Sequence, residues 1–488
     1  MSKKWKGRRS TARPEPMPSP HAAKPVPAPI LPAVGRVRYV MTGELELLSP
    51  LHLGTGDFRQ FKELALDVKK SEAESASPDV AAILRNDKDE PFLSGTSIKG
   101  LLRRIGEAIL PADRCARLFG EIGSEGRGRM GVVLVRGSEQ VRAADATGMP
   151  YRALVGERLG AGVFIAARTR IDGASGTAQN NALFFQEMVA AGARFGLALT
   201  IDCRTIAWSD EEQGSILTDL ACVLDRLGDA EGWAIGRGQA DGQGRLRLDR
   251  ATLATRRGTI DAQGTLVFAP FVLPRIDASP PAVPAPAFVL HCPGPFLIAD
   301  SSLRPQKEPE AGKESVQVSA QRAASLALVL GPSVMGALRA RAAWLDALDR
   351  HRHGQKADAL EYDDRNDSVP TIPVERLFGK TGFRGLIELR RLAVAGGRLQ
   401  RFTSVKLDRF SGAPIDNALF TTECFIDVRI HLTLALNSRG MIEPTDADRH
   451  LFDRLQAELC ADGLQLGHGT NAGFGWFSVE REVVHGAE

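Results

Sequence analysis

The segment with the clearest capacity for chemistry is SGTSIKGLLRR, which spans residues 94–104. Its two glycines let backbone N–H groups approach a ligand, and the N-terminus of the helix that follows carries partial positive charge. Lys99, Arg103 and Arg104 add full positive charges. The segment therefore predicts an anion site, most naturally for a phosphate. A tight strand-to-helix turn without a ligand would explain the glycines but not the basic run.

A related segment, LGPSVMGALR, spans residues 330–339. It keeps Gly331, Ser333, Gly336 and Arg339 but has a methionine where the first segment has Lys99. We expect this second anion site to be weaker or to depend more on backbone contacts.

His52 and Asp57 follow the first predicted strand. A carboxylate beside an anionic ligand is unfavourable unless it binds a metal or takes part in proton transfer. A solvated loop aspartate is the alternative. Asp300 stands at the matched position later in the chain, without a histidine beside it. The sequence contains no Walker lysine motif, HExxH or GxSxG, so these enzyme classes are not indicated.

These segments belong to an internal duplication. With the two anion-site segments, five blocks recur in the same order at offsets of 231 to 259 residues, which predicts two whole domains. The other aligned pairs are SPLHLGTGD (49–57) with CPGPFLIAD (292–300), RLFGEIG (117–123) with RLFGKTG (376–382), RIDGASGTAQNNALF (170–184) with KLDRFSGAPIDNALF (406–420), and IGRGQADGQGR (235–245) with LGHGTNAGFGW (466–476).

The elements around these blocks indicate an α+β fold. RVRYVMTGELELLS, ARFGLALTIDC and FIDVRIHLTLAL alternate like strands, and residues 210–228 and 446–463 read as amphipathic helices before each glycine-rich block. The apolar residues Leu101, Leu102, Ile105, Ala108 and Ile109 predict the buried face of the helix at the first anion site. Strand, helix, insertions, strand, helix and glycine loop fit a ferredoxin-like or RRM-like sheet.

Two further features, the glycine loops and a predicted hairpin, each have two interpretations. The glycine loops are either cradles for a phosphate backbone or tight hairpins packed against a helix. RTRIDGASGTAQNNALFFQE reads as strand, polar tip, strand, which is either a finger that wedges between bases or an ordinary exposed hairpin.

Composition limits the remaining classes. The 488 residues carry 62 Lys and Arg against 59 Asp and Glu, and the six cysteines form no CxxC pair, so we expect no zinc site and a reducing cytoplasm. No 18-residue apolar run predicts a membrane span, and no apolar core follows the basic start, so a secretory signal is not expected. The predicted organisation is a disordered basic tail (1–36), a first domain (37–272), a Pro-rich linker (273–287) and a second domain (288–484), with inserts at 68–90 and 347–370 left unassigned. The tail either lies on an anionic partner or only aids solubility.

The ordered blocks resemble the RAMP superfamily of CRISPR–Cas systems, in particular the Cas-seven group of backbone subunits in type III effector complexes. The resemblance extends over residues 37–250 and 287–480, and the fused arrangement is similar to tandem subunits of type III-D-like systems. It implies two tandem ferredoxin-like RAMP domains with projecting hairpins, which hold a CRISPR RNA while its bases pair with target RNA. Other type III effector subunits are the implied protein partners.

The resemblance also implies roles for individual residues. Asp57 and Asp300 would bind a divalent metal, Mg²⁺ in the first instance, and cleave target RNA beside thumb hairpins at 168–186 and 404–422. The glycine loops 236–244 and 467–475 would lie under the RNA backbone. The residues predicted to contact RNA are Gly95, Ser97, Lys99, Arg103, Arg104, Arg168, Arg170, Gly236, Arg237, Gly238, Gly331, Ser333, Arg339, Lys406, Gly467, His468 and Gly469.

The predicted function is thus a metal-dependent endoribonuclease within an RNA-guided complex. One alternative is a structural RNA-binding subunit without cleavage. Another is a metal-independent guide-processing endonuclease, for which His52 is the candidate in the first copy.

Overall fold

The computed structural model describes most of the chain after the basic tail. The described residues are 38–60, 79–122, 128–145, 162–171, 179, 182–202, 209–274, 285–299, 318–323, 325–354, 369–380, 382–438 and 442–480. The predicted tail (1–36), most of the predicted linker (275–284) and Asp300 lie outside these residues. Ala287, placed at the end of that linker, is the first residue of a strand.

The first repeat is built on an antiparallel sheet in the order β12-β13-β1-β11-β8-β4, with β7 also paired to β11 and β14 to β13. Its strands are β1 (Arg38–Leu47), β4 (Phe92–Leu93), β7 (Val133–Val135), β8 (Ser138–Arg142), β11 (Arg194–Asp202), β12 (Trp233–Ala234), β13 (Arg245–Ile260) and β14 (Leu266–Pro270). Its helices are α1 (Gly95–Ile109), α2 (Ala112–Phe119) and α3 (Asp210–Leu227). Side chains from both layers form one hydrophobic core.

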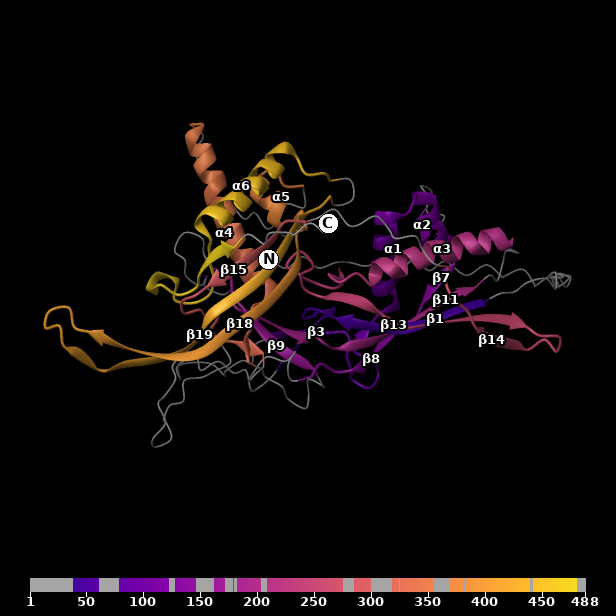
Figure 1. Ribbon diagram of the computed structural model, residues 1–488, viewed down its shortest axis with the longest axis horizontal. Helices are drawn as coiled ribbons and strands as arrows, with labels where there is room; N and C mark the ends of the chain where they lie inside the picture. The colour runs from indigo at the N-terminus through magenta and orange to yellow at the C-terminus, as the bar shows by residue number, and fades with distance from the viewer. Residues whose placement is uncertain are drawn as a thin grey trace, which may run out of the picture.

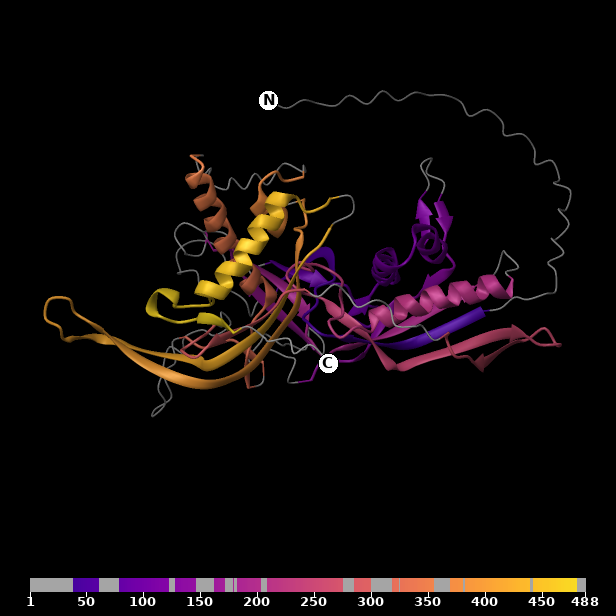
Figure 2. The ribbon, with the colours of Figure 1, turned by 45° about the horizontal axis from the view of Figure 1, so that its top comes forward.

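The second repeat uses the same plan with its own core. Its sheet has the order β18-β19-β15-β21-β20. The strands are β15 (Ala287–Cys292), β18 (Ile387–Leu407), β19 (Pro414–Leu436), β20 (Leu464–Gln465) and β21 (Trp476–Glu480), and the helices are α4 (Gly331–Arg352), α5 (Pro373–Phe378) and α6 (Asp446–Asp462). In both repeats the strand that follows the glycine loop pairs with the first strand of the repeat. Figure 2 shows the helices of both repeats on one side of the sheets.

Small sheets and hairpins complete the fold. These strands are β2 (Gly54–Gln60), β3 (Asp79–Ile83), β9 (Val163–Arg168) and β10 (Phe184–Val189) in a sheet of order β2-β3-β10-β9, with the pairs β5 (Gly120–Ile122) and β6 (Gly128–Met130), and β16 (Arg322–Ala323) and β17 (Leu326–Ala327).

Helix α1 follows the predicted pattern except near its C-terminal end. Ile98, Leu101, Leu102 and Ile105 are buried, whereas Ala108, predicted on the buried face, is exposed. Ser94 caps the helix, because its hydroxyl accepts from the N–H of Ser97 at 3.1 Å. Ser97 itself lies in the first turn.

The projecting hairpins differ between the repeats. In the first, β9 and β10 pair, while most of the predicted tip (172–178) lies outside the described residues. In the second, β18 and β19 form a ribbon that extends beyond the rest of the chain (Figure 1). FIDVRIHLTLAL, predicted as a separate strand, is the continuation of this ribbon, because β19 runs without a break from Pro414 to Leu436.

The two amphipathic helices before the glycine loops are present as predicted. Each begins with a capping box, Ser209 with Glu212 in α3 and Thr445 with Asp448 in α6. None of the helices in the described residues is long and apolar enough to cross a membrane.

Candidate RNA-binding and cleavage site

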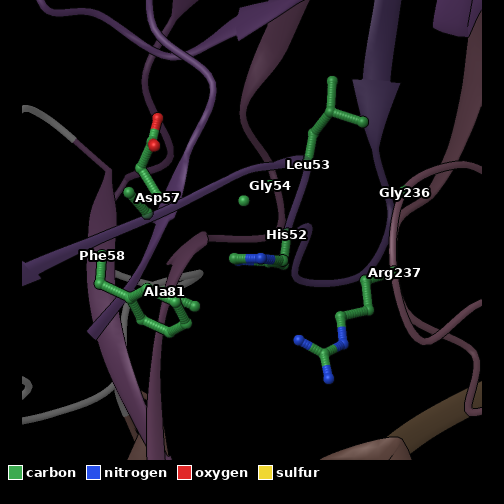
Figure 3. Close-up of a pocket in the computed structure, with 10 residues that line it drawn as sticks. His52, Leu53, Gly54, Asp57, Phe58, Ala81, Gly236 and Arg237 are labelled. Carbon is green, nitrogen blue, oxygen red and sulfur yellow. The ribbon is translucent and has the colours of Figure 1, made fainter. Parts of the chain in front are cut away.

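A cavity of about 410 Å³ lies where β2 and β3 meet the glycine loop of the first repeat. It brings together His52 and Asp57, predicted as catalytic, with Arg237, predicted to bind RNA (Figure 3). The remaining lining residues are Leu53, Gly54, Gly56, Phe58, Ala81, Ala82 and Gly236. Since β3 pairs with β10, the cavity lies beside the root of the β9–β10 hairpin.

His52 is held in one orientation by the backbone. Its side chain is nearly buried, at 3% exposure, and its Nδ1 lies 2.8 Å from the carbonyl oxygen of Glu187. Because a carbonyl only accepts, Nδ1 carries the proton and Nε2 is left as an acceptor. Burial lowers the pKa of His52 below its usual 6.5, with Arg237 and Arg168 acting in the same direction. His52 is therefore neutral at neutral pH.

Gly54 keeps the space around Nε2 open, since a Cβ atom there would lie 2.7 Å from it. Any larger residue at this position would push against the imidazole.

Asp57 is an exposed residue of strand β2, not of a loop as predicted. Its backbone N–H donates to the hydroxyl of Thr55 at 3.1 Å. In Figure 3 the Asp57 carboxylate and the Arg237 guanidinium lie on opposite sides of the His52 ring. No group of three His, Cys, Asp or Glu side chains suited to a metal ion occurs in the described part of the chain.

Glu187 is a functional residue that sequence reasoning missed. Its fully buried carboxylate accepts from the N–H of Ile83 at 2.9 Å and lies 3.3 Å from Arg85 and 3.6 Å from Arg59. It thus fixes β3 to β10 while its carbonyl orients His52. Glu423, at the matched position of the second repeat, pairs with Arg401 and accepts from Ser319. This recurrence after each hairpin block was a readable signal.

The basic residues of α1 have different surroundings. Arg103 pairs with Glu107 at 3.0 Å. Arg104 donates to Gln239 Oε1 at 2.6 Å and to the carbonyl of Ala234, so it ties the helix to the glycine loop. These contacts explain the presence of Arg104 without any ligand. Lys99 is half-buried and stays a candidate for phosphate contact.

The glycines of the two anion-site segments fall into two groups, those required by packing within the chain and those that are not. A Cβ on Gly95 would lie 2.7 Å from the carbonyl oxygen of Val135, so the close approach of α1 to β7 requires this glycine. Gly100 and its counterpart Gly336 have no atom within 4 Å of a Cβ. Both are exposed on the helix surface, where close packing within the chain does not explain them.

The first glycine loop turns sharply through left-handed positions at Gly236, Gly238, Gly242 and Gly244. The N–H of Arg237 donates to the carbonyl of His52 at 2.9 Å, which joins the loop to the cavity. Arg168, at the end of β9, is largely buried near Asp241 of this loop, and burial lowers its pKa to about 10. The loop thus carries Arg237 and lies beside the largely buried Arg168 of β9.

The second anion-site segment is partly covered by the first repeat. A Cβ on Gly331 would overlap the carbonyl oxygen of Asp241, so the N-terminus of α4 packs directly on the first glycine loop. A glycine is therefore required at position 331 by packing between the repeats, which the sequence did not reveal. Ser333 is exposed and stays a candidate for RNA contact.

The other predicted RNA contacts are dispersed. Lys406 is exposed on the outer part of the β18–β19 ribbon, Arg170 is half-buried beyond β9, and His468 is exposed on the second glycine loop. Gly467 and Gly469 take the same left-handed conformation as Gly236 and Gly238.

The comparison with known families covers both repeats. The model of the RAMP superfamily matches residues 44–247 and, separately, residues 291–478. These segments make up most of the chain, so the protein belongs to the RAMP superfamily, and the two matches are consistent with a tandem of RAMP domains. Membership implies a CRISPR RNA-binding effector subunit. No curated protein matches this chain.

Proposed function

We propose that this chain is a backbone subunit of a type III CRISPR effector complex, which binds CRISPR RNA and cleaves complementary target RNA at the first repeat. The observation that carries the proposal is the cavity that joins His52, Asp57 and Arg237 at the root of the β9–β10 hairpin. The shared strand order, β13-β1-β11-β8 in one repeat and β21-β15-β19-β18 in the other, supports the predicted ferredoxin-like fold.

Guide binding would rest on groups that do not read bases. Lys99 and Arg237 supply charge for phosphates, and the open surfaces at Gly100 and Gly336 allow a sugar-phosphate backbone to approach the helices. Duplex RNA offers mainly shape, phosphate and 2′-hydroxyl groups for recognition, so a subunit that accepts any guide needs such contacts.

Cleavage would use the residues of the cavity. A nucleotide displaced from the duplex brings its 2′-hydroxyl near the adjacent phosphate. Nε2 of His52 would take the proton of that hydroxyl as its oxygen bonds to phosphorus, and the P–O5′ bond would break as water protonates the leaving 5′-oxygen. Arg237 would pair with the phosphate. Asp57 lies on the other side of the imidazole, where it would act on the same nucleotide.

Asp57 is the described residue that would hold a divalent ion. Asp57 offers a single exposed carboxylate. Mg²⁺ is commonly bound by one or two carboxylates, with phosphates and water as its other ligands, so RNA phosphates and water could complete the site. When bound, such an ion would stabilise negative charge on the scissile phosphate. The chain's own contribution is to hold Asp57 on β2 beside the cavity. Asp300 remains the corresponding candidate of the second repeat.

The test is target-RNA cleavage by the reconstituted guide-bound complex, with Mg²⁺ or EDTA. We expect Asp57→Asn to remove one cut while guide binding persists. Asp87→Asn, which neutralises an exposed carboxylate on the turn between β3 and β4, is the matched control and should cut like wild type. Unchanged cutting by Asp57→Asn would overturn the cleavage assignment and leave an RNA-binding scaffold.

A further inference from the structure

Asp57 lies in a bulge of strand β2. The register of β2 on β3 shifts between Gly54 and Phe58, so β2 carries more residues than β3 over this stretch. Gly56 has a φ of 92° there, a left-handed conformation that glycine adopts easily. A bulge re-aims the side chains that it carries. The orientation of Asp57 therefore depends on what holds β2 directly after the bulge.

Arg59 provides that anchor. β2 is an edge strand, and Arg59 is the one residue among its seven that is not exposed. Its Nη2 donates to Asp89 Oδ1 at 2.8 Å, and its Nη1 lies 3.6 Å from Glu187 Oε1. One guanidinium thus spans two carboxylates, one on β10 and one on the turn between β3 and β4. A lysine could not contact both in this way, because an ammonium lacks the planar fork.

The two carboxylates that receive Arg59 are themselves held in place. Glu187 is fully buried, accepts from the N–H of Ile83 at 2.9 Å and lies 3.3 Å from Arg85. Asp89 has a φ of 60°, which is uncommon for a residue other than glycine, and its carbonyl accepts from Arg85 at 2.8 Å. Such a conformation persists only where the surrounding contacts determine it. Arg59 is therefore attached to a rigid support.

Glu187 supports both candidate catalytic residues. Its carbonyl oxygen accepts from Nδ1 of His52 at 2.8 Å, and its carboxylate receives Arg59, which stands two residues after Asp57. The position of Asp57 relative to His52 is thus fixed through Glu187 by two short links. Loss of the Arg59 side chain would release the link to Asp57 and leave the link to His52 intact.

The second repeat supplies the matching cation from a different element. Glu423 corresponds to Glu187 and pairs with Arg401, which lies opposite it on the hairpin strand β18. In the first repeat the residue opposite Glu187 on the hairpin is Ile165. Both hairpins therefore bury a carboxylate at the same place. The second repeat compensates its charge from within the hairpin, whereas the first uses an arginine of β2.

This exchange of cations follows the two candidate aspartates. Arg59 stands two residues after Asp57, whereas Ser302 stands two residues after Asp300. An arginine on the hairpin compensates a buried carboxylate as well as one on β2 does. The charge of Glu187 alone therefore does not explain why its cation comes from β2. A second task for that cation, holding the bulge that carries Asp57, does explain it.

We infer that Arg59 is a positioning residue for cleavage at the first repeat, and that its contacts with Glu187 and Asp89 fix Asp57 at the cavity. Arg59 acts through Asp57 and does not touch the reacting atoms. The second repeat has no arginine at the matched position, so cleavage there does not use this brace. The inference rests on the proposed function.

The test is single-turnover cleavage of target RNA by the reconstituted guide-bound complex. We expect Arg59→Gln to slow the cut assigned to the first repeat by about 10- to 100-fold, since a small displacement of a catalytic group is costly. Target affinity should stay unchanged. In an Asp57→Asn background, Arg59→Gln should cause no further loss. Lys88→Gln, which neutralises an exposed cation next to Asp89, is the matched control and should cut like wild type.

Moving the arginine separates positioning from stability. Arg59→Gln should also unfold at a lower urea concentration, because Glu187 loses one of its cations. Arg59→Gln combined with Ile165→Arg places the cation where the second repeat has it. The unfolding midpoint should then return toward that of wild type, while cleavage stays as slow as in Arg59→Gln alone.

Three results would overturn the inference. Recovery of cleavage in the relocated variant, or a wild-type rate for Arg59→Gln, would leave Arg59 as a residue that only stabilises the fold. A loss of target affinity with an unchanged rate at saturating target would make Arg59 an RNA contact. Failure of the proposed function is seen separately, as unchanged cutting by Asp57→Asn, and would overturn both.

Discussion

The two glycine loops share a backbone and differ in what surrounds them. The first contributes Gly236 and Arg237 to the cavity and joins the second repeat through Ala240 and Arg245. The second is exposed and presents Trp476. The comparison teaches that duplication preserved the positive-φ turns, which only glycine adopts easily, while side chains at the same positions acquired different partners.

The projecting hairpins differ in a comparable way. The β18–β19 ribbon ends in a turn in which Asp408 accepts from the N–H groups of Phe410 and Ser411 at 3.0 and 2.8 Å. Phe410 is 99% exposed at this tip, where the aligned residue of the first repeat is Ala174. An exposed aromatic side chain suits stacking on a base, so the second hairpin is better equipped for that role.

The largest expected effect concerns the ion pair between the repeats. Glu388→Leu leaves the Arg245 guanidinium buried without its carboxylate, and we expect a loss of about 3–5 kcal/mol in the free energy of unfolding. Arg245→Trp combined with Glu388→Leu replaces both charges with the residues found at the matched positions of the other repeat, Trp476 and Leu134, and should restore part of the loss. Chemical denaturation measures both. If Glu388→Leu were as stable as wild type, the Arg245–Glu388 ion pair would not stabilise the contact between the repeats.

Gly331→Ala should have the next largest effect. The added methyl group overlaps the Asp241 carbonyl, and overpacking of this kind costs about 1–3 kcal/mol. Gly336→Ala, in the same helix, meets no atom within 4 Å and is the control. Calorimetry should show a lower melting temperature for Gly331→Ala only, and limited proteolysis should show cutting between the repeats. If both variants behave alike, α4 does not pack tightly on the first loop.

Gly100→Ala should separate stability from function. The helix gains up to about 1 kcal/mol because alanine is the better helix former, while the methyl group occupies the surface proposed for the RNA backbone. Thermal unfolding should therefore rise as guide affinity falls. A variant that is more stable and binds guide RNA like wild type would remove Gly100 from the RNA surface.

The smallest effect is a pH dependence from His52. Its pKa is lowered on folding, so its stabilising contribution is complete above its ordinary value of 6.5 and is lost as pH falls through the lowered value. Wild type should lose more of its free energy of unfolding than His52→Gln between about pH 7 and pH 5, measured by urea unfolding. Parallel curves would show that the imidazole is not held neutral.

The fold was largely readable from the sequence because its signals are local. Alternation predicted β1 and β11, and apolar spacing predicted α1, α3 and α6. His52 and Asp57, which belong to one sequence block, both line the cavity. The role of Arg104 was not readable, because its acceptors Gln239 and Ala234 are more than 100 residues away and are brought near only by folding.

The junction between the repeats was beyond sequence reasoning for the same reason. Gly331 reads as part of an anion site when only its neighbours are considered, and its contact with Asp241 depends on how two folded bodies pack. The length of the β18–β19 ribbon was also missed, since its exposed outer part has no core to impose alternating burial.

The most direct test of the account is the salt dependence of CRISPR RNA binding by the effector complex assembled without its guide. If Lys99 and Arg237 contact phosphates, each substitution to alanine should weaken binding equally for unrelated guide sequences. Each should also reduce the slope of log affinity against log salt by about 0.7–0.9. Val267→Glu, on the exposed strand β14, removes no basic residue and is the control, so its salt slope should match that of wild type. Slopes unchanged in both alanine variants, or losses confined to one guide sequence, would contradict the claim that this protein holds a guide by its backbone.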